Sequence, residues 1–483
     1  MSPSSTSGVP AARKLPQRVV TAYGFGAVAY GVKDAGFGTF LLLFYNQAVG
    51  LPSATVGLVI GAALLIDAFV DPAVGFFSDR TRSRWGRRHP WMYASILPIM
   101  VGYGLLWMPP AASPGATLAW LFVFAVLVRT AVSCYEIPSV ALTAELSGDY
   151  DERTRILAWR YLWGWIGGLS IGLSAWLYFL QPTPEFPNGQ LNRDAYLGYG
   201  IVAALLMGIA ILVSALGTHR QIPYLPQAGE RTAKTLREGF GELKEAFRNR
   251  GFRILMLAAL CAYINQGVIY ALSVYTSTHL WGFTPTTFII QGLTLMTAAL
   301  IAFALAPRLG KRFSKPAIAS RVVLAGALFV TLPYWLRLAG VPLLPGNPVT
   351  IPLVLGIGMI GTACNITGFI LGASMMADVV EDSEERTGRR DEGLFFAGSF
   401  FVQKCTSGVG IFLAGLMLAA AGFPARAVVG QVPVEVLDRL ALIHAGVYLL
   451  VACLSAWVFR RFPFGRLEHE ARLGRLAASA ERG

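Results

Sequence analysis

The stretch SATVGLVIGAALLIDAFVDPAVGFFS, residues 53–78, is long and apolar, yet it contains two carboxylates, Asp67 and Asp71. A helix needs roughly 20 apolar residues to cross a hydrocarbon core about 30 Å thick. A charge at the bilayer centre costs at least about 2.5–3.5 kcal/mol on insertion scales, and such residues usually mark functional pathways. The stretch therefore predicts a membrane-spanning helix that carries a functional site.

The rest of the chain has the same apolar character. It has 483 residues, of which 55% are hydrophobic and 14% charged, whereas soluble proteins have about 25% charged residues. Hydropathy predicts about twelve spans, and strands of a β-barrel are too short to explain them. The sequence thus predicts an all-α polytopic membrane protein. The predicted spans lie near 19–48, 53–78, 89–110, 116–146, 153–182, 195–216, 252–280, 285–306, 314–336, 349–380, 392–421 and 436–461.

The charge distribution predicts the orientation of the chain. The net charge is +13, and the loop DRTRSRWGRRH, residues 79–89, carries five arginines, while the loops at 47–55 and 108–117 carry no charge. Basic loops face the cytoplasm, so we expect both termini on that side of the membrane. Because this orientation explains the positive charge, we do not expect a nucleic-acid partner. The polar first 18 residues lack a signal-peptide pattern. We expect a bacterial cytoplasmic (inner) membrane, because the chain is rich in Arg and Ala and has no long glycosylated loops.

A polar linker at 217–251 divides the spans into two groups of six. It contains the amphipathic segment TAKTLREGFGELKEAFRNR, which predicts a helix on the cytoplasmic surface. The halves at 19–216 and 252–461 have short basic loops at matching positions, GRRHPW and LGKRFSKP. Two such halves, with cytoplasmic tails at 1–18 and 462–483, are typical of the major facilitator architecture.

Other predicted spans also contain charged residues. These are Lys33 and Asp34 in the first span, Arg129 and Glu136 in the fourth, and Lys404 in the eleventh. Together with Asp67 and Asp71, these side chains have a total formal charge of −1. One bound monovalent cation would bring that charge to zero. Because the two aspartates are four residues apart, they share a helix face. Close carboxylates do not both ionise cheaply unless a cation joins them, which suits H⁺, Na⁺ or Li⁺. The alternative is ion pairing within the bundle, to Lys404 or Arg160.

Arg129 lies on the same helix face as Ser133 and Glu136. Its guanidinium has two candidate roles, which are to neutralise Glu136 or to bind a carboxylate or phosphate of a substrate. The sequence has no HExxH motif and no nucleotide-binding P-loop, so neither a metalloprotease nor ATP-driven transport is expected. The five cysteines lie within predicted spans without a CxxC pair, as expected for small buried side chains.

Four segments carry a resemblance to a known family. They are residues 67–92 (DAFVDPAVGFFSDRTRSRWGRRHPWM), 29–40 (AYGVKDAGFGTF), 134–155 (CYEIPSVALTAELSGDYDERTR) and 400–410 (FFVQKCTSGVG). Together the chain resembles the glycoside–pentoside–hexuronide:cation symporter family of the major facilitator superfamily. The resemblance implies about twelve helices in two pseudo-symmetric halves, with solute transport by alternating access.

The resemblance also implies roles for individual residues. Asp67 and Asp71, with the hydroxyl of Ser133, would form the site for the coupling cation, and Lys404 would connect that site to the substrate. Asp34 and Glu136 would bind sugar hydroxyls, and Arg160 matches an arginine that the family has near the sugar. Lys33, beside Asp34, is a further candidate for solute binding, and so is Arg129, which has no charged counterpart in the best-known permease of the family. For Arg160 an anchor at the cytoplasmic surface is an equal alternative. Apart from the resemblance, Asn265, Gln266 and Asn365 are lesser candidates, for which hydrogen bonding between helices is an equal explanation. His444, near the start of a span, is interpreted as structural.

The sequence departs from the family pattern near both sites. Val70 stands where sodium-using permeases often have Asn, which favours H⁺ as the coupling ion and leaves Na⁺ open. Val140 replaces an aromatic residue, and Glu136 replaces a shorter Asp. The identity of the sugar is therefore open.

The basic loop after the second span is predicted to act as a conformational latch. Its residues are Asp79, Arg82, Arg84, Gly86, Arg87 and Arg88. Asp79 is expected to cap a helix end, and the arginines to pair with acids such as Glu145, Asp149 or Asp151. The acidic segment at 378–392 is a candidate for the same role in the second half.

The favoured function is symport of a glycoside or hexuronide with H⁺ or Na⁺, by a monomer without a cofactor in a lipid bilayer. Two alternatives stay open. One is a transporter of an amphipathic anion such as a lysophospholipid, and the other is a sensor that transports nothing.

Overall fold

The computed structural model describes residues 14–147, 149–225, 241, 244–387 and 392–463, and in these ranges all regular elements are helical. Eleven helices are long and apolar enough to cross a membrane within the described part of the chain. The remaining predicted span is α5 (His89–Leu106), which is shorter and contains Pro98. The predicted all-helical fold is confirmed. The other long helices are α4 (Ser53–Arg80), α6 (Pro114–Leu146), α7 (Tyr150–Ser174), α8 (Arg193–His219), α10 (Arg250–His279), α11 (Pro285–Arg312), α12 (Lys315–Leu338), α13 (Thr350–Thr387), α14 (Glu392–Ala421) and α15 (Val434–Phe459).

The first span is not one regular helix. It consists of α1 (Gln17–Phe25), α2 (Val28–Ala35), a π-helical turn at Gly36–Phe40, α3 (Leu41–Leu43) and a second π-helical turn at Phe44–Ala48. Glycine is a weak helix former, and this span contains several. Single π-turns are frequent at functional sites, and Asp34 lies just before the first one.

By internal contacts the chain forms two compact units. The first contains Met1–Phe37, Phe69–Ala175 and Asp194–Leu236. The second contains Gly38–Ala68, Trp176–Arg193 and Arg237–Gly483. The sequence predicted that each half is a continuous part of the chain. In the structure, parts of the first, second and fifth spans belong to the second unit, which also contains the spans of the C-terminal half. The boundary within α4 falls between Asp67 and Asp71.

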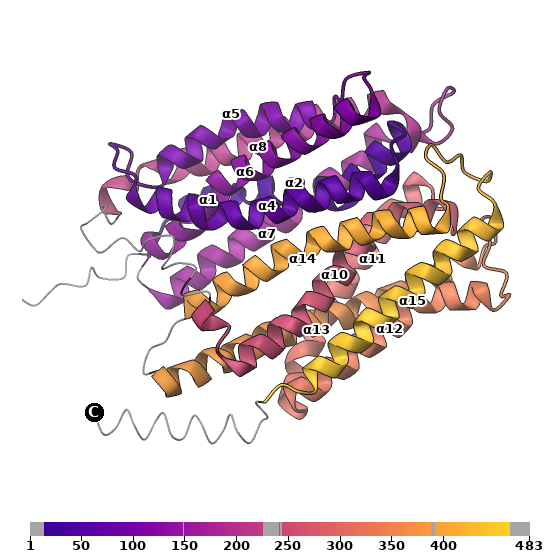
Figure 1. Ribbon diagram of the computed structural model, residues 1–483. Coiled ribbons are helices and arrows are strands. Elements are labelled where there is room, and N and C mark those ends of the chain that lie inside the picture. Colours follow the sequence, from indigo (N-terminus) through magenta and orange to yellow (C-terminus); the bar gives the residue numbers. More distant parts are fainter. Residues whose placement is uncertain (1–13, 148, 226–240, 242–243, 388–391, 464–483) are drawn as a thin grey trace, which may run out of the picture. The chain divides into compact units, whose positions relative to one another are not determined.

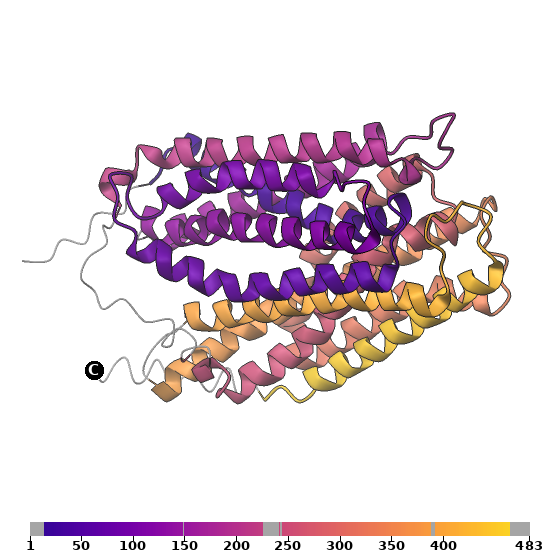
Figure 2. The same cartoon turned by 45° about the horizontal axis from the view of Figure 1, so that its top comes forward.

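In the first unit, α2 packs along α7 and α5 packs along α6 (Figures 1 and 2). The approach of α2 to α7 depends on glycine. A Cβ built on Gly31 would lie 2.0 Å from the carbonyl oxygen of Gly164. Small residues at a helix interface let two backbones come close in a membrane. This contact brings Lys33 and Asp34 to the helix that carries Arg160.

In the second unit, α14 lies between two close partners. A Cβ on Gly408 would lie 2.9 Å from Leu64 Cβ and 3.0 Å from the Gly61 carbonyl oxygen of α4. On another side, a Cβ on Gly410 would lie 2.5 Å from the Ile264 carbonyl oxygen of α10. These contacts place Lys404, one turn before Gly408, against the part of α4 that carries Asp67.

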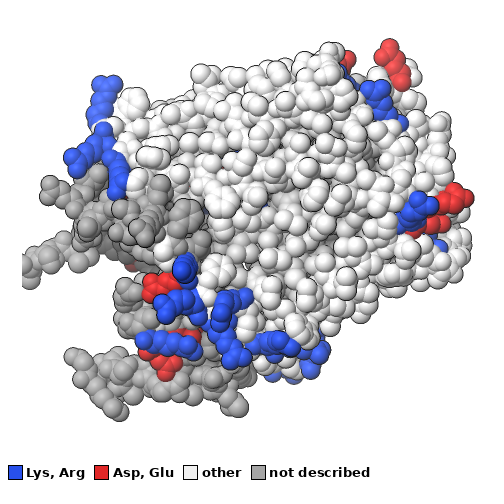
Figure 3. Space-filling model, in the orientation of Figure 1, with Lys and Arg blue, Asp and Glu red and all other residues white. Residues whose placement is uncertain are grey.

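The surface agrees with insertion in a bilayer. On the face seen in Figure 3, charged side chains lie toward the ends of the helices, and a broad band between them carries none. Large apolar side chains are exposed on many helices, among them Leu97, Phe303 and Leu450 at 69%, 64% and 70%. Most of the predicted amphipathic linker helix and of both tails lies outside the described residues.

Candidate functional site

Asp67 and Lys404 form a buried ion pair in the second unit. Lys404 Nζ lies 3.2 Å from Asp67 Oδ2, and the two side chains are 16% and 2% exposed. A carboxylate removed from water is tolerated only when it is paired or protonated. The pair confirms the predicted bundle contact, and it occupies one of the two carboxylates that were expected to hold the coupling ion.

Asp71 has a different partner, in the first unit. The hydroxyl of Ser133 on α6 donates a hydrogen bond of 2.6 Å to Asp71 Oδ1. One position further along α4, Pro72 lacks an N–H and cannot donate to the Ala68 carbonyl four residues back. A carboxylate and a hydroxyl are oxygen ligands of the kind that hard cations prefer. The structure thus brings Ser133 and Asp71 together as predicted.

Lys33, Asp34 and Tyr30 form a compact group on α2. Lys33 Nζ lies 2.7 Å from Asp34 Oδ1, and it lies 4.0 Å from the centre of the Tyr30 ring. The Lys33 side chain is buried, whereas that of Asp34 is 50% exposed. An ionised carboxylate that stays exposed within a membrane span requires a water-accessible cavity. Asp34 is therefore the exposed member of this ion pair.

Tyr30 connects this group to α6. It interacts electrostatically with Asp34, Glu136 and Arg129. Arg129 is buried, and its guanidinium carbon lies 5.4 Å from the centre of the Phe37 ring. The face of α6 that was predicted to carry Arg129, Ser133 and Glu136 therefore borders α2.

Arg160 lies inside the first unit and is not a surface anchor. Its side chain is buried, donates a hydrogen bond of 2.8 Å to the Ser139 hydroxyl, and interacts electrostatically with Glu136. The guanidinium carbon also lies 5.8 Å from the centre of the Tyr23 ring. The total charge of −1 calculated from the sequence did not include Arg160. When Arg160 is counted, the four cationic side chains of the predicted site balance its four carboxylates, and the total formal charge is zero.

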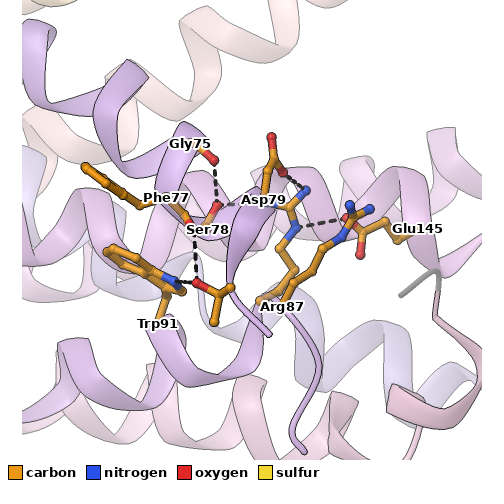
Figure 4. A network of polar contacts seen from close by, with 9 residues as sticks. Gly75, Phe77, Ser78, Asp79, Arg87, Trp91 and Glu145 are labelled. Atoms are coloured by element: carbon orange, nitrogen blue, oxygen red, sulfur yellow. Dashed lines mark hydrogen bonds and ion pairs between the residues drawn. The ribbon is translucent and has the colours of Figure 1, made fainter. Parts of the chain in front are cut away.

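The basic loop between α4 and α5 is held by a polar network in the first unit (Figure 4). Glu145 Oε1, at the end of α6, lies 2.9 Å from both Arg87 Nη2 and Arg88 Nε. Arg88 also pairs with Asp79 and donates to the Ser78 hydroxyl at 2.8 Å. The loop closes through Gly86, whose φ of +71° favours glycine.

The network corrects several details of the predicted latch. Asp79 pairs with Arg88 instead of capping a helix. Asp149 is itself the cap of α7, because its Oδ1 accepts a hydrogen bond from the Glu152 N–H. Arg82 and Arg84 are exposed, and Arg84 lies over the Trp85 ring. The side chain of Asp151 lies outside the described residues.

The second half has an ion pair at the matching position. Lys315, the first residue of α12, lies 2.7 Å from Asp378 Oδ1 of α13. Likewise, Arg88 directly precedes α5 and pairs with an acid of α6. Asp382, one turn further on, accepts a hydrogen bond from Asn249 and pairs with Arg386. Part of the acidic segment, residues 388–391, lies outside the described residues.

The lesser candidates serve contacts between or within helices. Asn265 donates to the Tyr448 carbonyl, Asn365 donates to the Tyr448 hydroxyl, and the His444 ring is buried and stacks on Tyr334. Gln266 donates to the Tyr270 hydroxyl on its own helix. The sequence interpretation missed Tyr30 and Ser139. Tyr30 lies four residues before Asp34, and Ser139 lies three residues after Glu136, so each spacing indicates a shared helix face.

One short motif fits an enzyme pattern by spacing alone. The segment GLSIG, residues 168–172, has the Gly-x-Ser-x-Gly order of a hydrolase nucleophile elbow. It lies inside the continuous helix α7, where there is no strand-to-helix turn to expose the serine. The motif therefore lacks the context that the chemistry needs.

Comparison with known proteins gives a consistent family. The profile of the family described as MFS/sugar transport protein matches residues 22–466. A glucuronide carrier protein homolog of Escherichia coli K12 is 24% identical, with 92% of this chain and 93% of the relative covered. A sodium-dependent lysophosphatidylcholine symporter of Gallus gallus is also 24% identical, with 91% and 85% covered.

The fold itself is similar to that of solved transporters. The crystal structure of a D-xylose–proton symporter superposes with a TM-score of 0.63 at 13% identity, covering 92% of this chain and 97% of the other. At that identity the likeness supports the fold alone. The family match over most of the chain is the stronger finding. The chain is therefore an integral membrane protein that belongs to the MFS/sugar transport family, the glycoside–pentoside–hexuronide:cation symporters of the major facilitator superfamily.

Proposed function

We propose that the protein is a secondary active symporter that moves a sugar-type solute, a glycoside or a hexuronide, together with H⁺ or Na⁺. The observation that carries the proposal is the buried pair of Asp67 and Lys404. A cation that binds the carboxylate must displace the ammonium of Lys404. Competition of this kind ties ion binding to the arrangement of α4 and α14.

The solute would bind beside the half-exposed Asp34. Carboxylates accept charge-assisted hydrogen bonds from hydroxyl groups, often two at a time, which suits vicinal diols. Glu136 on α6, the helix that borders α2, would supply a second acceptor. H⁺ is favoured over Na⁺ because Val70 offers no side-chain oxygen ligand beside Asp71.

The network around Glu145 and the pair of Lys315 with Asp378 would hold the cytoplasmic loops in one conformational state. In this proposal both termini are cytoplasmic, as the basic loops indicate, and the membrane is a bacterial inner membrane. The protein acts as a monomer without a cofactor. Rocking of repeats about a central site is the usual route of alternating access.

A second candidate solute is a lysophospholipid. The similarity to the lysophosphatidylcholine symporter favours it, as does the exposed Val140, which lies one turn beyond Glu136 on α6 and is 42% exposed. An apolar side chain there suits an acyl tail better than a sugar ring.

The test is uptake by purified protein in proteoliposomes, with radiolabelled glycosides, hexuronides and lysophosphatidylcholine under imposed H⁺ or Na⁺ gradients. Accumulation of a sugar against its gradient, driven by one ion, is expected. Accumulation of the lysolipid alone would select the second candidate. No transport of any solute, with binding retained, would indicate a sensor.

A further inference from the structure

The loop before α4 is fastened to the loop between α14 and α15, at the end of α4 remote from the basic loop. Arg426 donates a hydrogen bond of 2.9 Å to the Val49 carbonyl, and a Cβ built on Gly50 would lie 2.6 Å from Arg426 Nε. Within the described residues, Arg426 is the only one besides glycine with a positive φ, +57°. Such a backbone is unfavourable for an L-residue, and it persists at clamps and switches where the surroundings hold it.

Two buried amides, Asn46 and Gln47, complete this contact. Gln47 Nε2 donates to the Pro424 carbonyl at 3.2 Å, and Gln47 Oε1 accepts a hydrogen bond of 2.8 Å from the Ala427 N–H. Asn46 Oδ1 accepts from Gln47 Nε2 at 2.5 Å and from the Tyr275 hydroxyl of α10 at 3.0 Å. We call the contacts made by Asn46, Gln47 and Arg426 the outer clasp. It contains no ion pair, so any response to a coupling ion has to reach it from elsewhere.

A row of close contacts between α4 and α14 connects the outer clasp to the buried ion pair, entirely within the second unit. At the clasp end, the Ser53 hydroxyl donates to the Gly415 carbonyl at 3.0 Å. At the other end, Lys404 pairs with Asp67. Between them the two backbones touch at glycines, which are Gly57 and Gly61 of α4 and Gly408 and Gly415 of α14. Packed interfaces of this kind move between discrete arrangements instead of deforming gradually.

We propose that the outer clasp is the extracytoplasmic closure of the carrier, and that the pair of Asp67 and Lys404 controls it through the contacts of α4 with α14. The proposal rests on the proposed symport function. A cation that takes Asp67 from Lys404 removes the electrostatic attraction at one end of the row, so the clasp opens more often and a solute enters with the ion. Because coupling between two sites is reciprocal, a closed clasp weakens cation binding at Asp67.

The Ala427 N–H reports on the clasp directly, because its acceptor is the Gln47 side chain. Amide hydrogen exchange at Ala427 is measured on the purified full-length protein in nanodiscs. Gln47→Leu removes the acceptor and should speed exchange about tenfold. Lys404→Gln should also speed it, while Lys404→Arg should leave it slow. Lys315→Gln is the matched control, because it breaks another ion pair of the second unit, with Asp378 of α13, and should leave the exchange unchanged.

Two results would overturn the proposal. Wild-type exchange at Ala427 in Gln47→Leu would remove the clasp, and wild-type exchange in Lys404→Gln would remove its control by the ion pair. If Lys404→Gln fails to fold, Gly408→Ala decides instead, because its Cβ would lie 2.9 Å from Leu64 Cβ and would push α14 from α4. The exchange at Ala427 should again be faster, and an unchanged rate would contradict control through these helices.

A second measurement tests whether the clasp must open during transport. Val49→Cys with Arg426→Cys, in protein whose five cysteines are replaced by alanine, is joined by a bis-maleimide that contains a reducible disulfide. Uptake of p-nitrophenyl β-D-glucoside and p-nitrophenyl β-D-glucuronide into proteoliposomes should be lost on cross-linking and restored by dithiothreitol. Arg426→Cys with Val429→Cys is the control, because it lacks the same arginine but ties two positions of one loop, and it should keep its uptake.

Full uptake by the protein cross-linked between residues 49 and 426 would overturn the assignment of the clasp as the closure. Absence of uptake before cross-linking, in the wild type as well, would count against the symport function. The exchange at Ala427 does not depend on transport, so it still decides whether the ion pair controls the clasp.

Discussion

Lys404 of α14 contacts Asp67 of α4 at 3.2 Å, at the level where glycine allows the two helices to touch. The contact joins a position in the eleventh predicted span to one in the second. Breaking a buried ion pair by removing one partner costs about 3–5 kcal/mol, while replacing both partners is often neutral. This asymmetry makes the pair open to a direct test.

Lys404→Gln and Asp67→Asn should each lower the thermal unfolding temperature in detergent, because each leaves one charge buried without compensation. The double variant should regain much of the loss. If the decrease in unfolding temperature of the double variant equals the sum of the decreases of the two single variants, the two side chains do not stabilise each other.

Ser133→Ala should identify the coupling ion. The hydroxyl donates a 2.6 Å hydrogen bond to Asp71 Oδ1. If the ion is H⁺, loss of that bond should change the pH at which uptake is half-maximal and leave the Na⁺ dependence as it is. If the ion is Na⁺, a ligand is lost, and more Na⁺ is needed for half-maximal uptake. No change in either dependence would remove Ser133 from the cation site.

Glu145→Gln should loosen the loop between α4 and α5. The Glu145 carboxylate is 7% exposed and is shared by Arg87 and Arg88, so its neutralisation leaves two guanidinium groups without their common partner. Amide hydrogen exchange in residues 79–89 should become faster, and transport slower. The exposed Arg82→Gln is the matched control. Equal exchange in wild type and Glu145→Gln would show that the network does not hold the loop.

Gly408→Ala should separate α14 from α4. The new Cβ would meet Leu64 Cβ at 2.9 Å, and overpacking of this kind typically costs about 1–3 kcal/mol. We expect a lower unfolding temperature and weaker ion coupling. Gly446→Ala serves as a control, because a Cβ there has nothing within 4 Å. Similar behaviour of the two variants would argue against a close helix contact.

Much of this arrangement could be predicted from sequence because a lipid environment makes charges costly. The apolar runs of the sequence predict the helices. The charged residues inside these runs stand out as exceptions, and they include Asp67, Asp71, Glu136 and Lys404. Arg160 could not be placed this way. Near the start of a span, an arginine can reach the surface or turn inward, and the choice depends on Ser139 of another helix.

The loop network illustrates a second limit. The residue types and a pairing with Glu145 were predictable, but the contact of Asp79 with Arg88 depends on how the loop folds back through Gly86. The π-helical turn after Asp34 was also missed, because periodicity over a glycine-rich apolar span does not distinguish α from π geometry. Tyr30 was overlooked since a single tyrosine in an apolar span gives no signal by itself.

The most direct test of the central claim, cation coupling through the carboxylates of α4, compares two assays on Asp71→Asn proteoliposomes. One is accumulation of a transported sugar under an ion gradient, and the other is exchange of labelled for unlabelled sugar at equilibrium. The account predicts loss of accumulation with exchange retained, because the solute group around Asp34 is intact. Undiminished accumulation by Asp71→Asn and by Asp67→Asn would contradict it.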